Sequence, residues 1–283
     1  MGTPEQAKQK AAATYNAASD SYDHPANSFW DRHGRRTVDR LGLRAGARVL
    51  DVCCGSGASA IPAAEAVGPD GFVLGVDLAG SLLALARAKA ETRGLANVEF
   101  RTGDMLDLGL PPSSFDAVIC VFGIFFVPDM EAAIRELWRL VQPRGQLAIT
   151  TWGERFLEPV NTAFWDAVRV VKPELYKGFN PWDRASDPET VRALVAAAGV
   201  ENPAVVAERG AQPLSSPEDW WAMVLGTGYR GTIEQLDAGA REQVRRDCLR
   251  FIERNQVGAV EVNVVFALGT RGTAGPPDDE MQR

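Results

Sequence analysis

The sequence predicts an α/β protein built on a doubly wound, mainly parallel β-sheet. Between residues 48 and 152, short apolar segments typical of strands alternate with longer segments typical of helices. The first apolar segment leads directly into a glycine-rich turn, "CCGSGAS", at residues 53–59. A later segment, "AVICVFG" at residues 117–123, is apolar throughout, as expected of a strand covered on both faces. Such units wind into a parallel sheet through right-handed crossovers.

Each element of the first half follows from its apolar pattern and its turn residues. Gly68 and Gly94 stand where helices should end, and the second strand should end at Asp77. The expected elements are helices at 4–20 and 28–43, a strand at 48–53, a helix at 58–68, a strand at 71–77, a helix at 81–94 and a strand at 97–105.

The second half continues the alternation and then becomes less regular. A Pro and Gly pair at residues 143–145 should end one helix, and Asp187 should cap another. The expected elements are a strand at 115–123, a helix at 130–145, a strand at 146–152, helices at 153–171 and 187–200, a strand at 204–210, two or three helices at 216–256 and a last strand at 260–269. The sheet therefore has seven expected strands, with a helical insert before the last one.

This order divides the chain into four parts. Residues 1–43 should form an N-terminal helical lid, and residues 44–152 the cofactor-binding core. Residues 153–271 should contain the rest of the sheet with helical inserts that cap the substrate. Residues 272–283, rich in Pro, Gly and acidic side chains, should be a disordered tail.

Composition favours an ordinary globular protein over several other classes. The chain has 283 residues, of which 46% are hydrophobic and 24% charged, and its formal net charge is −7. Because the densest basic cluster is only "RHGRR" at residues 32–36, nucleic acid is not an expected partner. No apolar run is long enough to span a membrane, and the N-terminus lacks the apolar region of a signal peptide. The four cysteines lack metal-ligand spacing, so we expect no metal site and a cytoplasmic location.

The glycine-rich turn leaves two cofactors open. Gly55-x-Gly57-x-x-Ala60 fits the relaxed fingerprint of dinucleotide-binding turns. Asp51, however, stands at the end of the preceding strand, where a carboxylate would repel a pyrophosphate. S-adenosylmethionine carries an ammonium group and no phosphate, so it would be favoured by the same carboxylate.

Acidic residues at the next two strand ends favour S-adenosylmethionine. Asp77 should accept hydrogen bonds from both ribose hydroxyls. NAD proteins also place an acidic residue in this role, so Asp77 alone does not discriminate between the two cofactors. Asp104 should lie on the adenine side and accept from the exocyclic amine, with Met105 covering the ring. The alternative is that these are polar loop residues. The set of three acids makes a methyl donor more favourable than a nicotinamide cofactor.

Three stretches resemble the class I S-adenosylmethionine-dependent methyltransferases, and more narrowly the ubiquinone/menaquinone C-methyltransferase-like group. They are "VLDVCCGSG", "GVDLAGSLLALARAKA" and "FDAVICVFGIFFVPD". The resemblance covers about residues 12–152. Cys53 stands where this family usually has the first glycine of the turn. Val121 stands where the quinone enzymes tend to have a small polar residue, which disfavours a quinol acceptor. The cofactor-binding set is then Tyr22, Asp51, Cys53, Gly55, Gly57, Asp77, Leu78, Gly103, Asp104, Met105, Val121 and Phe122.

Catalytic and substrate-binding residues are expected near the lid and the strand ends. His24 and His33 are candidates for a general base, and the alternative is that both are ordinary histidines. A pair of adjacent cysteines, Cys53 and Cys54, suits a tight turn better than arsenic chemistry. The acceptor pocket should be lined by aromatic residues, although each of them is equally compatible with core packing: Phe29, Trp30, Phe125, Phe126 and Trp152.

Two functions remain open from the sequence. The first is a methyltransferase acting on a small, largely apolar acceptor at O, C or N. The second is a protein that binds S-adenosylmethionine on the same fold without transferring a methyl group, because a fold does not fix a function. The acceptor, the methylated atom and the oligomeric state are not predicted.

Overall fold

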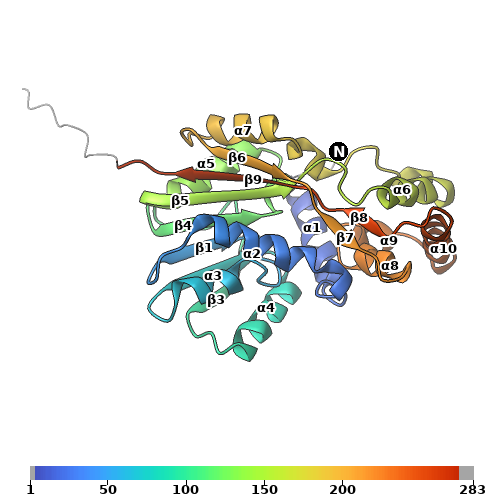
Figure 1. Cartoon of the computed structure of the whole chain (residues 1–283), viewed down its shortest axis with the longest axis horizontal. Helices are drawn as coiled ribbons and strands as arrows, with labels where there is room; N and C mark the ends of the chain where they lie inside the picture. The colour runs from blue at the N-terminus through green and yellow to red at the C-terminus, as the bar shows by residue number, and fades with distance from the viewer. Residues whose placement is uncertain (1–3, 274–283) are drawn as a thin grey trace, which may run out of the picture.

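The structure is a computed structural model, and it describes residues 4–273. In this part of the chain, seven strands form one sheet in the order β3-β2-β1-β4-β5-β9-β6 (Figure 1). Its parallel strands are β1 (Arg48–Val52), β2 (Phe72–Asp77), β3 (Val98–Thr102), β4 (Phe115–Val121) and β5 (Val141–Trp152). β9 (Val264–Thr270) lies between β5 and β6 (Ala204–Glu208) and runs antiparallel to both. The doubly wound, mainly parallel sheet predicted from the sequence is confirmed.

Helices cover both faces of the sheet. On one face lie α2 (Phe29–Leu41), α3 (Ala60–Val67) and α4 (Gly80–Thr92), each beside the next (Figure 1). On the other face lie α5 (Met130–Leu140) and α7 (Pro188–Ala197). β1 and β4 are therefore buried from both sides, which explains why residues 117–121 are apolar at every position.

A second group of helices lies beyond one end of the sheet. It consists of α6 (Val160–Val171), α8 (Glu218–Leu225), α9 (Arg230–Ile233) and α10 (Ala238–Arg254), and we call it the cap (Figure 1). Helix α1 (Pro4–Ala18) contacts both α4 and α9, so it lies between the sheet domain and the cap. Short 3₁₀ helices connect these parts: Pro25–Asn27, Ile124–Phe126, Pro173–Leu175 and Pro181–Ala185.

Three expected elements were wrong in their boundaries. The helix expected at 153–171 begins only at Val160, because Pro159 cannot continue a helix interior and stands at its N-cap. The helix expected at 130–145 ends at Leu140, and Val141 already pairs with Phe115 in the sheet. The expected last strand is two strands, since β8 (Ala259–Glu261) pairs with β7 (Ala211–Pro213) outside the main sheet. β7 itself was not expected.

The two ends of the chain were expected to be a lid and a tail. Residues 274–283 of the expected tail and residues 1–3 of the expected lid lie outside the described residues. Of the N-terminal segment, α2 packs on the sheet face, with Phe29, Val38 and Leu41 buried. Only α1 and the linker to α2 extend over the carboxyl ends of the strands, so we restrict the lid proposal to these two parts.

Candidate cofactor and active site

A cavity of about 230 Å³ opens at the carboxyl ends of β1, β2 and β4, below α1. Ten of the expected cofactor residues line it: Tyr22, Cys53, Gly55, Asp77, Leu78, Gly103, Asp104, Met105, Val121 and Phe122. Two expected substrate residues, Trp30 and Phe126, line it as well. Strands that are distant in sequence thus bring their ends together at one sheet edge, as parallel topology requires.

Asp77 is held in place by the backbone around it. The N–H groups of Gly55 and Ala79 donate to its two carboxylate oxygens, at 2.9 and 2.8 Å. Burial nevertheless raises the pKa of Asp77, while these backbone donors oppose the rise. The carboxylate is therefore fixed in orientation at the cavity wall, ready to accept hydrogen bonds from a ligand's hydroxyl groups.

The turn between β1 and α3 carries its own strain. Cys53, which stands where the family usually has glycine, has a φ of 59°, a left-handed conformation that side chains with a Cβ rarely adopt. Gly55 and Gly57 also have positive φ values. A Cβ at Gly55 would come within 3.0 Å of the Tyr22 hydroxyl, so the tyrosine lies directly over the turn.

Helix α1 closes the cavity from above. Lys8, Ala11, Ala12 and Tyr15 share one helical face and line the cavity, and Glu5 lies next to them. Lys8 Nζ donates to Asp104 Oδ2 at 3.0 Å, while Tyr15 contacts Phe126 edge to face. The sequence analysis did not include Lys8 in the site, but the i, i+3, i+4, i+7 spacing of these four residues was a signal for it.

A polar network fixes the linker to the turn below it. Lys89 of α4 donates to Asp23 Oδ1 at 2.6 Å and to Ser56 Oγ at 2.8 Å, and Ser56 Oγ donates to Asp23 at 2.7 Å. Asp23 belongs to the linker and Ser56 to the glycine-rich turn. The network therefore ties the lid segment to the loop that forms the cavity floor.

Asp51 and Gly57 are not brought to the cavity. Asp51 is completely buried below the turn, where the Ser59 hydroxyl donates to its Oδ2 at 2.7 Å. Burial raises its pKa to about 7, with the Ser59 hydrogen bond opposing the rise. Gly57 does not line the cavity, and a Cβ there would come within 2.9 Å of Ile61. In this structure both residues shape the turn, in contrast to the expected cofactor contacts.

Neither histidine is brought to the cavity. His24 is exposed, and its Nδ1 accepts a hydrogen bond from the Ala26 N–H at the start of a 3₁₀ helix. His33 is buried, with its ring edge-on to Phe122 and Trp152. Burial lowers the pKa of His33 to about 3, and Arg32 and Arg36 lower it further. The imidazole is therefore neutral near pH 7 and a very weak base.

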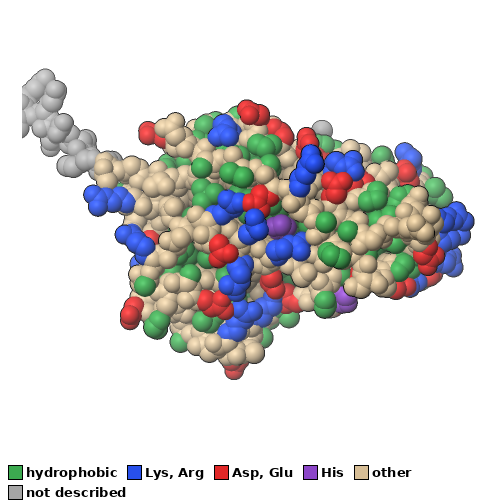
Figure 2. Space-filling model, in the orientation of Figure 1, with side chains coloured by type: hydrophobic (Ala, Val, Ile, Leu, Met, Phe, Trp, Pro, Cys, Tyr) green, Lys and Arg blue, Asp and Glu red, His purple; other side chains and the backbone are tan. Residues whose placement is uncertain are grey.

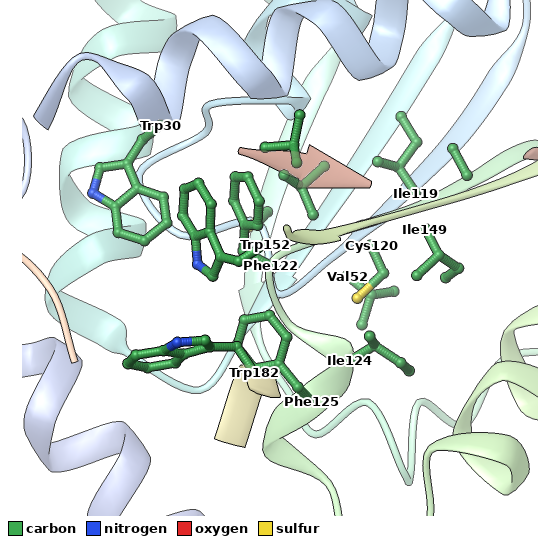
Figure 3. Close-up of a cluster of buried hydrophobic side chains, with 14 of the residues drawn as sticks. Trp30, Val52, Ile119, Cys120, Phe122, Ile124, Phe125, Ile149, Trp152 and Trp182 are labelled. Carbon is green, nitrogen blue, oxygen red and sulfur yellow. The ribbon is translucent and has the colours of Figure 1, made fainter. Parts of the chain in front are cut away.

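Aromatic rings form a column behind the cavity wall. Phe122, which has a φ of 56°, stacks on Trp152 with ring centroids 3.6 Å apart, and Trp152 stacks on Phe156 at 3.9 Å. Figure 3 shows Phe122 and Trp152 face to face, with Trp30 beside them. Phe29, Phe125 and Trp152 are at most 2% exposed and belong to the core in this structure. Of the five expected substrate residues, only Trp30 and Phe126 reach the cavity.

Comparison with known proteins identifies the family. The family described as "Methyltransferase domain" matches residues 49–145. Aklanonic acid methyltransferase DauC from Streptomyces sp. (strain C5) is 34% identical over 193 residues, which cover 64% of this chain and 88% of that protein. The chain belongs to the class I S-adenosylmethionine-dependent methyltransferases.

Two further comparisons concern a second relative and the fold. Demethylmenaquinone methyltransferase from Listeria welshimeri is 33% identical over 177 residues, covering 61% of this methyltransferase and 75% of the relative. The crystal structure of YcgJ from Bacillus subtilis shares the fold, with a TM-score of 0.56 and 20% identity, and covers 86% of this chain and 100% of the other. The resemblance predicted from the sequence is confirmed.

The cavity of this methyltransferase fits the methyl donor of its family. The ionisable carboxyl groups that line it are Glu5, Asp77 and Asp104, and the only lysine or arginine among its described lining residues is Lys8. This charge balance suits the hydroxyl-rich ribose and the cationic sulfonium of S-adenosylmethionine, and it disfavours a pyrophosphate. The charged residues of the cavity wall therefore match S-adenosylmethionine better than NAD, as the sequence predicted.

Proposed function

We propose that this methyltransferase acts on a small, largely apolar acceptor and methylates it at oxygen, carbon or nitrogen. The observation that carries the proposal is the polarity of the cavity wall. Asp77 and Asp104 lie at the ends of β2 and β3, whereas Trp30, Phe122 and Phe126 form an aromatic wall on the other side. An acceptor held against that wall would lie beside the bound methyl donor, and apolar contacts would supply most of its affinity.

The chain's own residues would bind and align the reactants. Asp77 and Asp104 would hold the adenosine, and Tyr22 and the turn would enclose the methionine part. S-adenosylmethionine would supply an activated methyl group, and the aromatic wall would exclude water and orient the acceptor. Because neither histidine lines the cavity, we expect acceptors whose reacting atom is nucleophilic without help from a histidine base.

The relatives support small-molecule acceptors without naming one. The two relatives are named as methyltransferases of aklanonic acid and of demethylmenaquinone. Figure 2 shows basic and acidic side chains interspersed on the face in view. Arg35 pairs with Glu65 and Arg36 pairs with Glu208, so two of the three arginines in the basic cluster have an acidic partner within the chain. These pairs support an acceptor other than nucleic acid.

In the described part of the chain, no helix is both long and apolar enough to cross a membrane. The proposal for the cellular setting rests on the cysteines. Cys53, Cys54, Cys120 and Cys248 are all free thiols. Free thiols support a reducing compartment such as the cytoplasm.

Calorimetry and an acceptor screen test the proposal in two steps. Titration with S-adenosylhomocysteine tests the cofactor site, and absence of binding at about 1 mM would contradict it. Incubation with S-adenosylmethionine and aromatic acceptors should then release S-adenosylhomocysteine. Binding without release across a broad set of acceptors would favour the alternative, a protein that binds the donor without transferring its methyl group.

A further inference from the structure

A second cavity, of about 270 Å³, lies between α6 and the segment that follows it. It is separate from the cofactor cavity, and the aromatic column lies between them, since Phe122 lines the first cavity and Phe156 the second. Four aromatic residues contribute to its wall: Phe156, Trp165, Tyr176 and Trp182. Figure 3 shows Trp182 beside Phe125, on the side of the column away from Trp30.

The acceptor groups of this cavity are already occupied. Glu158 accepts from Asn161 and Thr162, at 2.8 and 2.9 Å. Asp166 pairs with Arg169 at 2.6 Å, and Asp183 accepts from the Asn180 N–H at 2.7 Å. One of the two basic groups, Arg155, pairs with Glu261 at 2.7 Å. The carboxylates are therefore satisfied by the protein itself.

Two hydrogen-bond donors in the same wall lack a protein acceptor. Lys177 Nζ lies 5.5 Å from the centre of the Trp165 ring, and the described residues offer it no ion pair or hydrogen bond. Lys177 is an exposed residue, yet desolvation by the atoms around it lowers its pKa, and the charge of nearby Lys10 lowers it further. Asn180 is only 7% exposed; its side chain accepts from the Asp183 N–H, but its amide N–H₂ donates to none of the described residues.

We propose that the second cavity binds a small aromatic carboxylate, with Lys177 as its charge partner and Asn180 as a second donor. A carboxylate supplies the acceptor oxygens that both donors lack, and a charge-assisted bond to an ammonium group is among the stronger polar contacts. The aromatic walls would hold the ring. The ligand should be a monoanion, because Arg155 is already paired and Lys177 alone among the described lining residues can balance one further negative charge. This site does not depend on methyl transfer.

Calorimetry with 2-naphthoate tests the site in the full chain, with S-adenosylhomocysteine present to fill the first cavity. We expect 2-naphthoate to bind about tenfold more tightly than its uncharged analogue 2-naphthamide. Lys177→Met should remove this difference, and Lys177→Arg should keep part of it. Lys172→Met is the matched control, because Lys172 donates to the Gln235 carbonyl outside the cavity. Binding of S-adenosylhomocysteine reports on the first cavity, so a failure there would contradict the proposed cofactor site and would leave the 2-naphthoate result as the test of the second cavity.

Lysine acetylation of the unmodified protein provides a second measurement. Lys177 should react more slowly when 2-naphthoate is present, whereas Lys172 should react equally in both states. Equal 2-naphthoate affinity in the wild type and Lys177→Met would overturn the proposal. So would absence of binding at about 10 mM, unprotected Lys177, or binding of 2-naphthylmethylamine in place of the carboxylate.

Discussion

Asp51 and Asp77 lie on neighbouring strands, as the fourth residue of β1 and the sixth residue of β2, yet only Asp77 lines the cofactor cavity. The difference comes from the turn. Gly55 donates its N–H to Asp77, whereas Asp51 lies below the turn and accepts from Ser59. At the scale of the residue, then, the same side chain in a similar pattern lines the cofactor cavity in one place and supports a loop in the other.

Replacing Asp77 should separate binding from folding. Asp77→Ala removes a fixed carboxylate that would accept hydrogen bonds from the ribose hydroxyls. A hydrogen bond to a charged group is worth about 1.5–3 kcal/mol. In calorimetry, S-adenosylhomocysteine should therefore bind about tenfold to a hundredfold more weakly. Asp70→Ala, at an exposed position before the same strand, is the control. Equal losses in both variants would show that the effect is not local.

The pKa values of His33 and Asp51 predict opposing effects on stability. His33 has a pKa of about 3 in the folded chain, below the usual 6.5. Between these two pH values the histidine is protonated in the unfolded chain and neutral in the folded chain. The free energy of unfolding therefore falls as the pH falls through this range. Asp51 has a pKa of about 7 in the folded chain, above the usual 3.8. Between these two pH values the carboxyl group is protonated in the folded chain and ionised in the unfolded chain. The free energy of unfolding therefore falls as the pH rises through this range. Between about pH 4 and 6.5 the two effects oppose each other.

Removing His33 should therefore expose the effect of Asp51. In His33→Leu, the free energy of unfolding should decline as pH rises from 4 to 6.5, by up to about 1.4 kcal/mol per pH unit relative to the wild type. Denaturant unfolding at several pH values measures this slope. His24→Gln changes an exposed histidine and should leave the wild-type profile intact; a parallel change in that variant would contradict the assignment.

At the scale of the element, α1 and α2 differ although both precede the sheet. α2 fits against the turn after β1 because Gly34 has no side chain, and a Cβ there would lie 2.3 Å from the Ala58 carbonyl oxygen. α1 instead spans the open cavity, with Lys8 and Tyr15 as its contacts. One helix is part of the core, and the other is positioned to act as a lid.

Gly34→Ala should destabilise the fold. The added methyl group meets backbone atoms that cannot move away, and overpacking of this kind costs about 1–3 kcal/mol. Chemical denaturation measures the loss. Gly80→Ala, at the start of α4 where no atom lies within 4 Å of the added methyl group, should be neutral or stabilising. Equal stability of the Gly34→Ala and Gly80→Ala variants would contradict the close packing of α2 against the turn.

Deleting residues 1–18 should remove the lid but leave the sheet folded. Because α1 covers the cavity and Lys8 contacts Asp104, S-adenosylhomocysteine should bind more weakly and turnover should be lost. In the intact chain, hydrogen exchange around residues 22–30 should slow when S-adenosylhomocysteine is added. A fully active truncation with equal exchange in both states would show that α1 only packs on the sheet.

At the scale of the whole molecule, the cap is joined to the rest through buried aromatic residues. Tyr229 of the segment before α9 is 1% exposed, contacts Phe164 and Trp182, and donates its hydroxyl to Asn161 Oδ1 at 2.6 Å. This single residue thus connects α6, the Trp182 segment and the helices after β7. Loss of one such contact should therefore lower the stability of the whole cap.

Tyr229→Phe tests how strongly the cap depends on that contact. Removing the hydroxyl leaves Asn161 Oδ1 without its donor, so the free energy of unfolding should fall by about 1–3 kcal/mol. S-adenosylhomocysteine affinity should not change, since Tyr229 does not line the cofactor cavity. Tyr176→Phe, at a 40% exposed position, is the control. A large loss of cofactor affinity in Tyr229→Phe would mean that the cap and the first cavity are coupled.

Local patterns were sufficient for the sheet and for most of the cofactor cavity. Alternating apolar segments determine strands and helices, and strand ends in a parallel sheet must meet at one edge, so Asp77, Asp104 and Phe122 could be placed from the sequence. The family's motifs narrowed the ligand to S-adenosylmethionine. These features depend on neighbours in the chain and on one general rule of topology.

Only the tertiary structure decided which side chains reach the cavity and which are buried. His33, Phe125 and Trp152 look like site residues in the sequence, but packing between distant elements encloses them. Lys8 reaches the cofactor cavity because α1 lies over the strand ends, and the second cavity, with Lys177 and Asn180, forms between α6 and the segment that follows it. Burial depends on contacts between residues far apart in the chain, and no local pattern of polarity specifies those contacts.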